Sequence, residues 1–198
     1  ESVTIGSGQP FSSMEESRSV VPAGAADAKS SGVAAVFNAV GRDYARTLLL
    51  PMLGGRDFSE AELTPGSSEP VAIIDDALAQ RLWPGEDALG RSIEFGDARG
   101  PERGRSMRII GIVPAVKHSL GNPRPFPHVY VPLGQHDDDA MTLQLRLAGE
   151  GVERTMLATV ARVIREVDDR MPVLRLETWR ENPGGGLGIW IIRPGPRG

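Results

Sequence analysis

Two adjacent carboxylates, Asp75 and Asp76, are the residues whose position most suggests chemistry, because they directly follow the apolar run 71–74. Acidic side chains at the end of a buried strand hold Mg²⁺ in many phosphotransfer enzymes. In the alternative interpretation, Asp75 caps the helix that begins there, and Asp76 lies favourably at the positive end of the helix dipole. No lysine, threonine or third acidic residue stands at a spacing that supports a metal site, so the pattern favours capping.

The three histidines do not predict a metal site either. His136 is followed by three aspartates, whose carboxylates are the hard oxygen ligands that divalent ions prefer. A run of consecutive charges is more often a solvated turn, because adjacent carboxylates rarely converge on one point. His118 and His128 stand alone, outside any His-x-x-x-His or His-Glu pattern. We therefore expect no metal ligands in this chain.

The motifs of nucleophilic and nucleotide chemistry are missing as well. The sequence has no cysteine, which excludes disulfides and thiol catalysis, and no Gly-x-Ser-x-Gly elbow of a serine hydrolase. The Gly-Ser-Gly at 6–8 has no third glycine, and the glycines at 184–186 lack the Lys-Ser or Lys-Thr ending of a phosphate loop. We expect no catalytic residue and no cofactor, which favours a binding or structural module over an enzyme.

Four arginines on or directly after a predicted hairpin loop at 97–106 are the best candidates for contact with a partner. They are Arg99, Arg103, Arg105 and Arg108. Such a cluster suits a lipid phosphate or an acidic partner, although Asp97 and Glu102 dilute it and an exposed hairpin tip explains it equally well. Irregular exposed segments often carry recognition residues, so we expect any contact surface at 97–106 and 118–128.

Composition argues against two further classes of protein. The 198 residues include 22 basic and 26 acidic ones, a net charge of −4, which disfavours nucleic-acid binding. No stretch approaches the roughly eighteen to twenty apolar residues of a membrane span, and the run 187–192 is far too short. The chain starts without a methionine or the pattern of a signal peptide, so we expect a piece of a longer protein.

Hydrophobic periodicity predicts short elements, in keeping with the 24 glycines and 16 prolines. Strands are expected at 33–40, 71–74, 93–95, 108–113, 129–131, 141–147 and 172–176, and helices after Asp43, after Asp75 and over 151–168. A strand–helix–strand order appears at 33–54 and again at 141–176. We expect these two units to share one sheet with helices on one face, as an α+β open sandwich.

The domain organisation is predicted from the turn-rich connector at 64–68. We expect four segments: a flexible N-terminal arm at 1–32, a subdomain formed by 33–65 plus 138–180, an inserted α+β subdomain at 66–137, and a tail at 181–198.

Three ordered strings in the chain resemble a known family. The first is YARTL (44–48), leading through PML (51–53) to GRDF (55–58). The second and most specific is VAIIDDALAQRLWPGED (71–87), continued by ALGRSI (88–93). The third is RIIGIV (108–113), followed by PRP (123–125) and VYVPL (129–133). Their order, over about residues 33–180, is similar to the extracytoplasmic core domain of MacB-like (FtsX-like) ABC transporter permeases.

The resemblance implies a fold and a location. The subdomain formed by 33–65 plus 138–180 would be porter-like, and 66–137 would be its inserted second half. The domain would lie between the first two transmembrane helices of a permease, on the outer face of the bacterial cytoplasmic membrane. The tail 181–198 would lead toward a membrane helix, although Pro194 and Pro196 cannot continue one. Such a domain is not catalytic, and strings such as GRDF and WPGED form turns rather than reactive sites.

The resemblance also implies partners and a role. The partners would be the ABC ATPase subunit, reached through the membrane part of the permease, a second permease copy and, in some systems, a periplasmic adaptor. The domain would relay ATP-driven conformational change or contact a substrate or adaptor. Two alternatives stay open: a stand-alone periplasmic ligand-binding or sensor module, and an acid-dependent hydrolase or phosphotransferase that uses Asp75 or Asp76.

Overall fold

One sheet contains all eleven strands of the part of the chain that the computed structural model describes. That part comprises residues 2–8, 16–25, 32–66, 69–97, 104–116, 126–136, 140–147, 153–168, 173–179 and 186–192. The strands are β1 (Ser2–Gly6), β2 (Ser17–Pro22), β3 (Val33–Val40), β4 (Gly54–Gly55), β5 (Val71–Asp75), β6 (Ser92–Phe95), β7 (Met107–Val113), β8 (His128–Pro132), β9 (Ala140–Arg146), β10 (Val173–Trp179) and β11 (Gly186–Ile192). The helices are α1 (Tyr44–Thr47), α2 (Glu60–Leu63), α3 (Asp76–Leu82) and α4 (Glu153–Val167), with a 3₁₀ turn η2 (Leu133–Gln135). The fold is therefore mixed α+β and dominated by its sheet.

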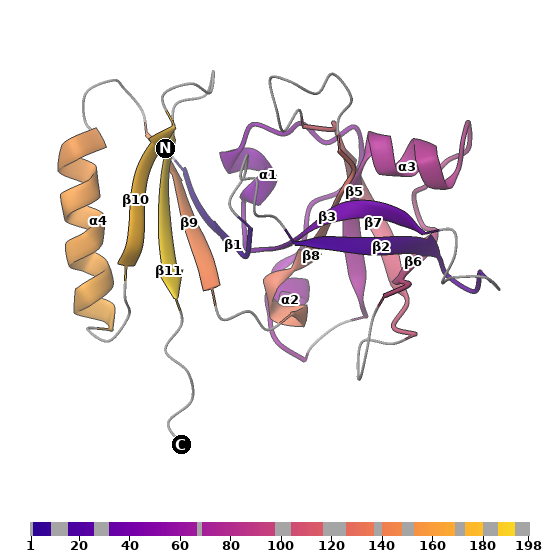
Figure 1. Cartoon of the computed structure of the whole chain (residues 1–198), viewed down its shortest axis with the longest axis horizontal. Helices are drawn as coiled ribbons and strands as arrows, with labels where there is room; N and C mark the ends of the chain where they lie inside the picture. Colours follow the sequence, from indigo (N-terminus) through magenta and orange to yellow (C-terminus); the bar gives the residue numbers. More distant parts are fainter. Residues whose placement is uncertain are drawn as a thin grey trace.

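Six of these strands close into a barrel, which fills the right-hand part of Figure 1. β3 pairs with β2, and the ring continues through β6, β7, β5 and β8 back to β3. The pairs β5–β7 and β3–β8 are parallel, and the other four pairs are antiparallel. Closure gives each of the six strands a neighbour on both sides, so the ring leaves no open edge.

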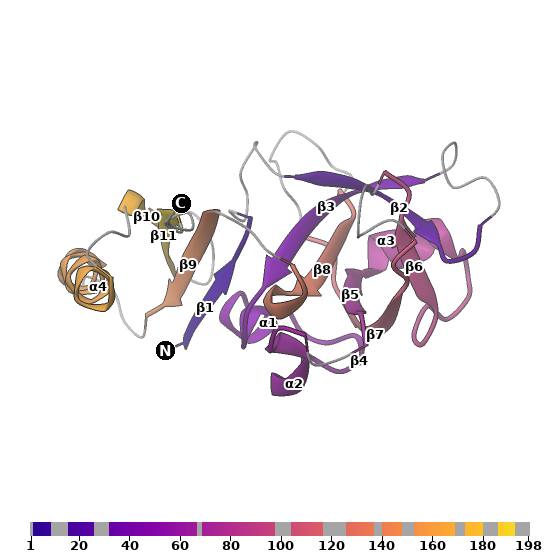
Figure 2. The same ribbon diagram turned by 90° about the horizontal axis from the view of Figure 1, so that it is seen from below.

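β1, β9, β10 and β11 form a four-stranded layer beside the barrel (Figures 1 and 2). β9 pairs with β1 on one side and with β11 on the other, and β10 pairs with the far edge of β11. α4 packs on this layer, where Val160 and Ile164 of the helix meet Leu143 and Leu145 of β9. None of the described helices is long and apolar enough to span a membrane.

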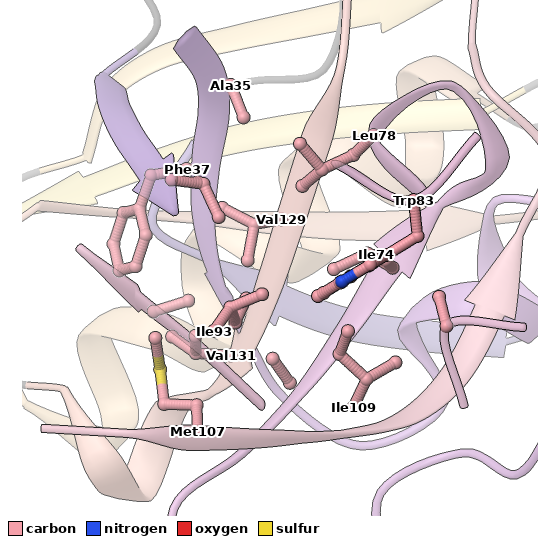
Figure 3. Packing of buried hydrophobic residues seen from close by; sticks show 14 residues of the cluster. Ala35, Phe37, Ile74, Leu78, Trp83, Ile93, Met107, Ile109, Val129 and Val131 are labelled. Carbon is pink, nitrogen blue, oxygen red and sulfur yellow. The ribbon is translucent and has the colours of Figure 1, made fainter. Parts of the chain in front are cut away.

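The barrel interior is the main hydrophobic core, part of which is shown in Figure 3. Alternate residues of the strands face inward, as a pleated strand with one face toward a core requires. The strand residues of this core are Val20, Ala35, Phe37, Ala39, Ala72, Ile74, Ile93, Met107, Ile109, Val129 and Val131. α3 contributes Leu78 and is followed by Trp83, and these two side chains cover one end of the barrel.

β5 is buried on both faces, as its uninterrupted apolar run predicts. Ala72 and Ile74 belong to the barrel interior, whereas Val71 and Ile73 lie in a second apolar cluster outside the barrel. The chain from 48 to 58 packs on this second cluster through partly buried side chains, which are Leu48, Leu50, Met52 and Phe58.

The string GRDF, expected to form a turn, instead begins in β4 with Gly55 and continues without an assigned turn to Phe58, which packs on the second cluster. Gly55 has a φ of 74°, and a Cβ there would lie 2.1 Å from the Ile110 carbonyl oxygen, so this position requires glycine. Arg56 then donates two hydrogen bonds to the Glu62 carboxylate, at 2.7 and 2.8 Å. Glu62 also accepts the backbone N–H of Ser59 at 2.7 Å, which completes a capping box at the start of α2.

The three predicted helices are present, whereas α2 was not predicted. α3 begins after Asp75, and α4 lies within the expected range 151–168. α1 begins after Asp43, but the Asp43 side chain makes no cap bond. The Asp43 backbone has a φ of 59°, and the Asp43 carboxylate lies 3.5 Å from the Arg46 guanidinium in the first turn of α1.

The described part of 1–32 differs from the expected flexible arm. β1 pairs with β9 from Ser2↔Arg146 to Gly6↔Thr142. β2 pairs with both β3 and β6 inside the barrel, and its Val20 is wholly buried. Segments rich in Ser, Gly and Ala have weak local preference for a strand, but pairing with strands that are distant in sequence overrides it.

The two strand–helix–strand units also differ from the expectation. β3 lies between β2 and β8, whereas β4 pairs with β7, so the strands of the first unit are not neighbours. β11 separates β9 from β10 in the second unit, so part of the expected tail is an inner strand of the layer. The structure therefore groups 33–40 with the strands of 71–132 rather than with 138–180. Periodicity identifies strands but carries no information about their partners.

The paired Arg56 guanidinium holds the pKa of the Glu62 carboxyl at about 2, well below its usual range. A carboxyl whose folded pKa is lowered stabilises the fold fully above its unfolded pKa and loses that contribution as pH falls toward the folded pKa. We therefore predict that Glu62→Gln flattens the pH dependence of the unfolding free energy between pH values of about 5 and 2. Urea unfolding across this range measures the effect, with the exposed Glu60→Gln as control. Identical pH dependence in both variants would contradict the prediction.

Candidate functional site

Asp75 is buried at the point where β5 ends and α3 begins. Its Oδ1 atom accepts the backbone N–H of Leu78 at 2.7 Å, which confirms the predicted helix cap. Its Oδ2 atom accepts the backbone N–H of His128 at 2.9 Å and lies 3.1 Å from the Nδ1 atom of the same residue. One carboxylate therefore links the start of α3 to the start of β8.

Burial dominates the electrostatics of this carboxyl group. Desolvation raises the pKa of Asp75, and the hydrogen bonds from His128 and Leu78 oppose that rise. His128 is itself buried and stacks on Tyr130, with ring centroids 5.9 Å apart. Asp76 accepts the backbone N–H of Ala115 at 2.8 Å. Both aspartates thus accept hydrogen bonds from backbone N–H groups of the same chain, which favours a structural role for them over a catalytic one.

The part of the chain that the structure describes contains no group of three or more His, Asp or Glu residues that could hold a metal ion. The ring of His136 packs edge-on against Phe37, with centroids 4.7 Å apart. His118 and the three aspartates at 137–139 lie outside the described residues.

The end of the barrel that α3 leaves uncovered has a small hollow, which we call the barrel mouth. It is lined by Phe37, Phe95, Arg105, Met107, Val131, Gln135 and His136. The hollow measures about 20 Å³, which is room for about one water molecule or one small polar group. These residues come from β3, β6, β7 and β8 and from the chain next to them, so only barrel closure brings them together.

Two aromatic rings that line the barrel mouth form what we call its aromatic floor, and the Arg18 guanidinium lies over both. Phe37 and Phe95 meet edge to face, with ring centroids 5.5 Å apart. The Arg18 guanidinium carbon lies 5.2 Å from the Phe37 centroid and 5.5 Å from the Phe95 centroid, and Arg18 Nε donates to Glu16 at 2.6 Å. A guanidinium over aromatic rings is held by attraction to the ring quadrupole.

Arg105 is the cation of the mouth that is best placed to bind an anion. It is half-buried, and its Nη1 atom donates to the Gln135 carbonyl oxygen at 3.2 Å. Among the described residues, no carboxylate forms an ion pair with Arg105. A guanidinium held by one hydrogen bond retains N–H groups that can bind a carboxylate in two-point fashion.

The predicted arginine cluster is only partly testable, because Arg99 and Arg103 lie outside the described residues. Arg105 lines the barrel mouth, whereas Arg108 is half exposed on the barrel wall and lies 3.8 Å from Glu69. Arg18, Phe37 and Phe95 were not predicted as site residues, and they stand on the separate strands β2, β3 and β6. No local motif marks them, so the sequence held no signal for the aromatic floor.

A family model described as the MacB-like periplasmic core domain matches residues 6–169. A search of curated proteins found no match.

Two solved structures share the fold at low sequence identity. The periplasmic region of MacB from Actinobacillus actinomycetemcomitans has 16% identity and a TM-score of 0.56, over 84% of this chain and 67% of that chain. The extracellular domain of the noncanonic ABC-type transporter YknZ from Gram-positive bacteria has 15% identity and a TM-score of 0.56, over 85% of this chain and 76% of that chain. Both likenesses support the mixed α+β, sheet-rich fold.

The buried bonds of Asp75 predict a stability difference between the two adjacent aspartates. Asp75→Asn should lower the free energy of unfolding by about 1–3 kcal/mol, because a buried amide cannot accept the N–H groups of both Leu78 and His128. Asp76→Asn should cost less than about 1 kcal/mol, since its contact is exposed. Urea unfolding of both variants at neutral pH measures the difference, and equal losses would contradict the structural assignment of Asp75.

Proposed function

Because the chain belongs to the family of MacB-like periplasmic core domains, we propose that it is the non-catalytic extracytoplasmic domain of an ABC transporter permease. The observation that carries the proposal is the match of the family model from residue 6 to residue 169. The family is periplasmic or extracellular, so this domain lies outside the cytoplasm. The shared fold with transporter domains from two other bacteria supports the proposal.

The described chemistry agrees with a domain that does not catalyse a reaction. The conspicuous carboxylates Asp75, Asp76 and Glu62 each accept hydrogen bonds from groups of the same chain. A catalytic acid or base needs an oxygen within reach of a substrate, and buried Asp75 has both oxygens engaged.

The proposed contact with a substrate or adaptor lies at the barrel mouth. Arg105 is the proposed anchor, since it presents N–H groups above an apolar floor in a half-buried position. A carboxylate of the partner would form a charge-assisted pair with it, stronger than a pair in open water because the floor excludes solvent on one side. Arg99 and Arg103 on the same predicted hairpin remain predicted contributors. Arg108 is not part of the proposed contact, because it lies on the barrel wall 3.8 Å from Glu69.

The remaining parts of the proposal concern partners and motion. The ABC ATPase subunit would act on the domain through the membrane part of the permease, next to a second permease copy and, in some systems, a periplasmic adaptor. We further propose that the layer with α4 is the porter-like part and that the barrel is the other subdomain. Two observations support this division: the barrel strands pair among themselves in a closed ring, and each part has its own apolar cluster.

The alternative is a stand-alone periplasmic ligand-binding or sensor module. The barrel mouth does not supply the site that this alternative needs, because about 20 Å³ is far below the several hundred Å³ of an ordinary small-molecule site. A mouth of this size fits one functional group of a larger partner.

The gene around this segment tests the proposal directly. A permease predicts an apolar span of about twenty residues on each side of the domain. A cleavable signal upstream and a stop codon directly downstream would instead favour the stand-alone module and overturn the permease assignment.

Two charge reversals test the contact. In the intact transporter with its ATPase, Arg105→Glu should reduce transport at least about tenfold, because the like charge repels the docked carboxylate. Arg108→Glu is the matched control on the wall of the same barrel and should leave transport within about twofold of wild type. Transport and basal ATP hydrolysis are measured together, so that a misassembled transporter is recognised. Equal loss in both variants would argue against the barrel mouth as the contact.

A further inference from the structure

The barrel and the layer are joined through a narrow connection. Among the described residues, β1 and β3 share a single register pair, Gly6↔Val40, whereas β1 pairs with β9 along its whole length. Two backbone hydrogen bonds flank that pair, from Gly41 N–H to the Ile5 carbonyl at 2.7 Å and from Ser7 N–H to the Ala39 carbonyl at 2.8 Å. The sheet is therefore continuous between the two parts only over this short stretch.

Asn38 pins this connection with side-chain hydrogen bonds. Its Oδ1 atom accepts the Gly8 N–H at 2.8 Å and the Ser7 hydroxyl at 3.3 Å, and its Nδ2 atom donates to the Tyr44 hydroxyl at 2.7 Å. The Ser7 oxygen in turn accepts the Ala39 N–H at 2.9 Å. The end of β1, the end of β3 and α1 are therefore fixed to one another at this point.

Beyond this point, the contact between α1 and the layer is polar. α1 packs against β1 and β9, and a Cβ at Gly6 would lie 3.2 Å from Tyr44, so α1 lies over the face of the ladder that Gly6 presents. Because side chains alternate along a strand, Thr4 of β1 lies on the same face as Gly6. The register Thr4↔Gln144 and Gly6↔Thr142 places Gln144 and Thr142 of β9 on this face as well. Thr142 and Gln144 are 1% exposed.

The buried polar side chains on this face have atoms without a hydrogen-bond partner in the protein, and so do two more residues of β1 and α1. The atoms on the face are Thr4 Oγ1, Thr142 Oγ1, Gln144 Oε1 and Gln144 Nε2, and the others are Ser2 Oγ of β1 and Thr47 Oγ1 of α1. Within the described part of the chain, these are the only buried side-chain nitrogen or oxygen atoms that lack a partner. Buried polar atoms in folded proteins are nearly always hydrogen-bonded, because an unmet donor or acceptor is costly away from water. The opposite face of the same strand is apolar and packs on α4.

From this contrast we infer that the barrel and the layer separate at the contact of α1 with β1 and β9, turning about the Asn38 connection. Separation lets water reach the unpartnered hydroxyl and amide groups, which offsets the loss of packing. The bonds at Asn38 survive because they lie at the pivot. The use of this motion in a relay rests on the proposed function, whereas the motion itself is inferred from the packing alone.

A chain without cysteine makes the opening directly measurable, since a single introduced thiol reports on solvent access. Thr4→Cys places the thiol in the polar contact, and Ala35→Cys places one in the barrel interior as reference. In the full chain under native conditions, maleimide should label Thr4→Cys at least about tenfold faster than Ala35→Cys, because local opening requires less free energy than unfolding of the barrel. Thr47→Cys is a second reporter if the first variant does not fold. Equal labelling rates would overturn the inference.

Closing the joint is the second arm of the experiment. Thr142→Val removes an unpartnered hydroxyl at nearly constant shape and should slow the labelling of Thr4→Cys by about tenfold, because the closed contact no longer buries that group. Leu143→Val, on the α4 face of the same strand, is the matched control and should not slow it. Unchanged labelling in the Thr142 variant would contradict the proposed separation. Labelling reports on the joint alone, whereas the transport effect of Arg105→Glu reports on the proposed function, so the two can fail independently.

Discussion

The parallel pairing of β3 with β8 is the contact on which the barrel depends. It runs from Val36↔His128 to Val40↔Pro132 and joins the two ends of what would otherwise be an open sheet. With it, the alternate apolar residues of six strands face one enclosed interior, and no strand of the ring has an open edge. Burial of those side chains is the largest favourable contribution to the stability of the fold.

The same closure positions the polar groups. His128 opens β8 and lies beside Asp75 only because β8 runs between β3 and β5, so the buried carboxylate has a partner as a consequence of the ring. The two ends of the barrel then differ: side chains of α3 and its following turn cover one, and the other ends in an aromatic floor with Arg105 beside it. This asymmetry is the reason that we propose the contact surface at the mouth rather than at the α3 end.

The layer is held by two contacts of opposite character. α4 packs on one face of β9 through aliphatic side chains, an interaction that strengthens as apolar area is buried. α1 meets the other face across hydroxyl and amide groups, each of which costs about 1–3 kcal/mol when it is buried without a partner. The first contact therefore keeps the layer intact, while the second is easily opened. Such a pair of contacts suits a domain that passes motion between two bodies.

The sequence by itself determined the features that depend on neighbours within a few residues. The burial of β5 on both faces, the cap formed by Asp75 and the amphipathic helix α4 all follow from local spacing and backbone geometry. The family resemblance of the strings at 44–58, 71–93 and 108–133 rests on the same local features.

Only the tertiary structure decided which strands pair and what those pairs bring together. The placement of β1 and β11 in the layer, the union of Phe37, Phe95 and Arg105 at the mouth, and the unpartnered groups opposite α1 leave no mark in local sequence. The alternation of apolar and polar residues along a strand indicates which face is buried, but it does not indicate which element covers that face. The partner is settled by closure of the ring and by the register between strands that are far apart in the chain, and neither constraint acts within a short segment.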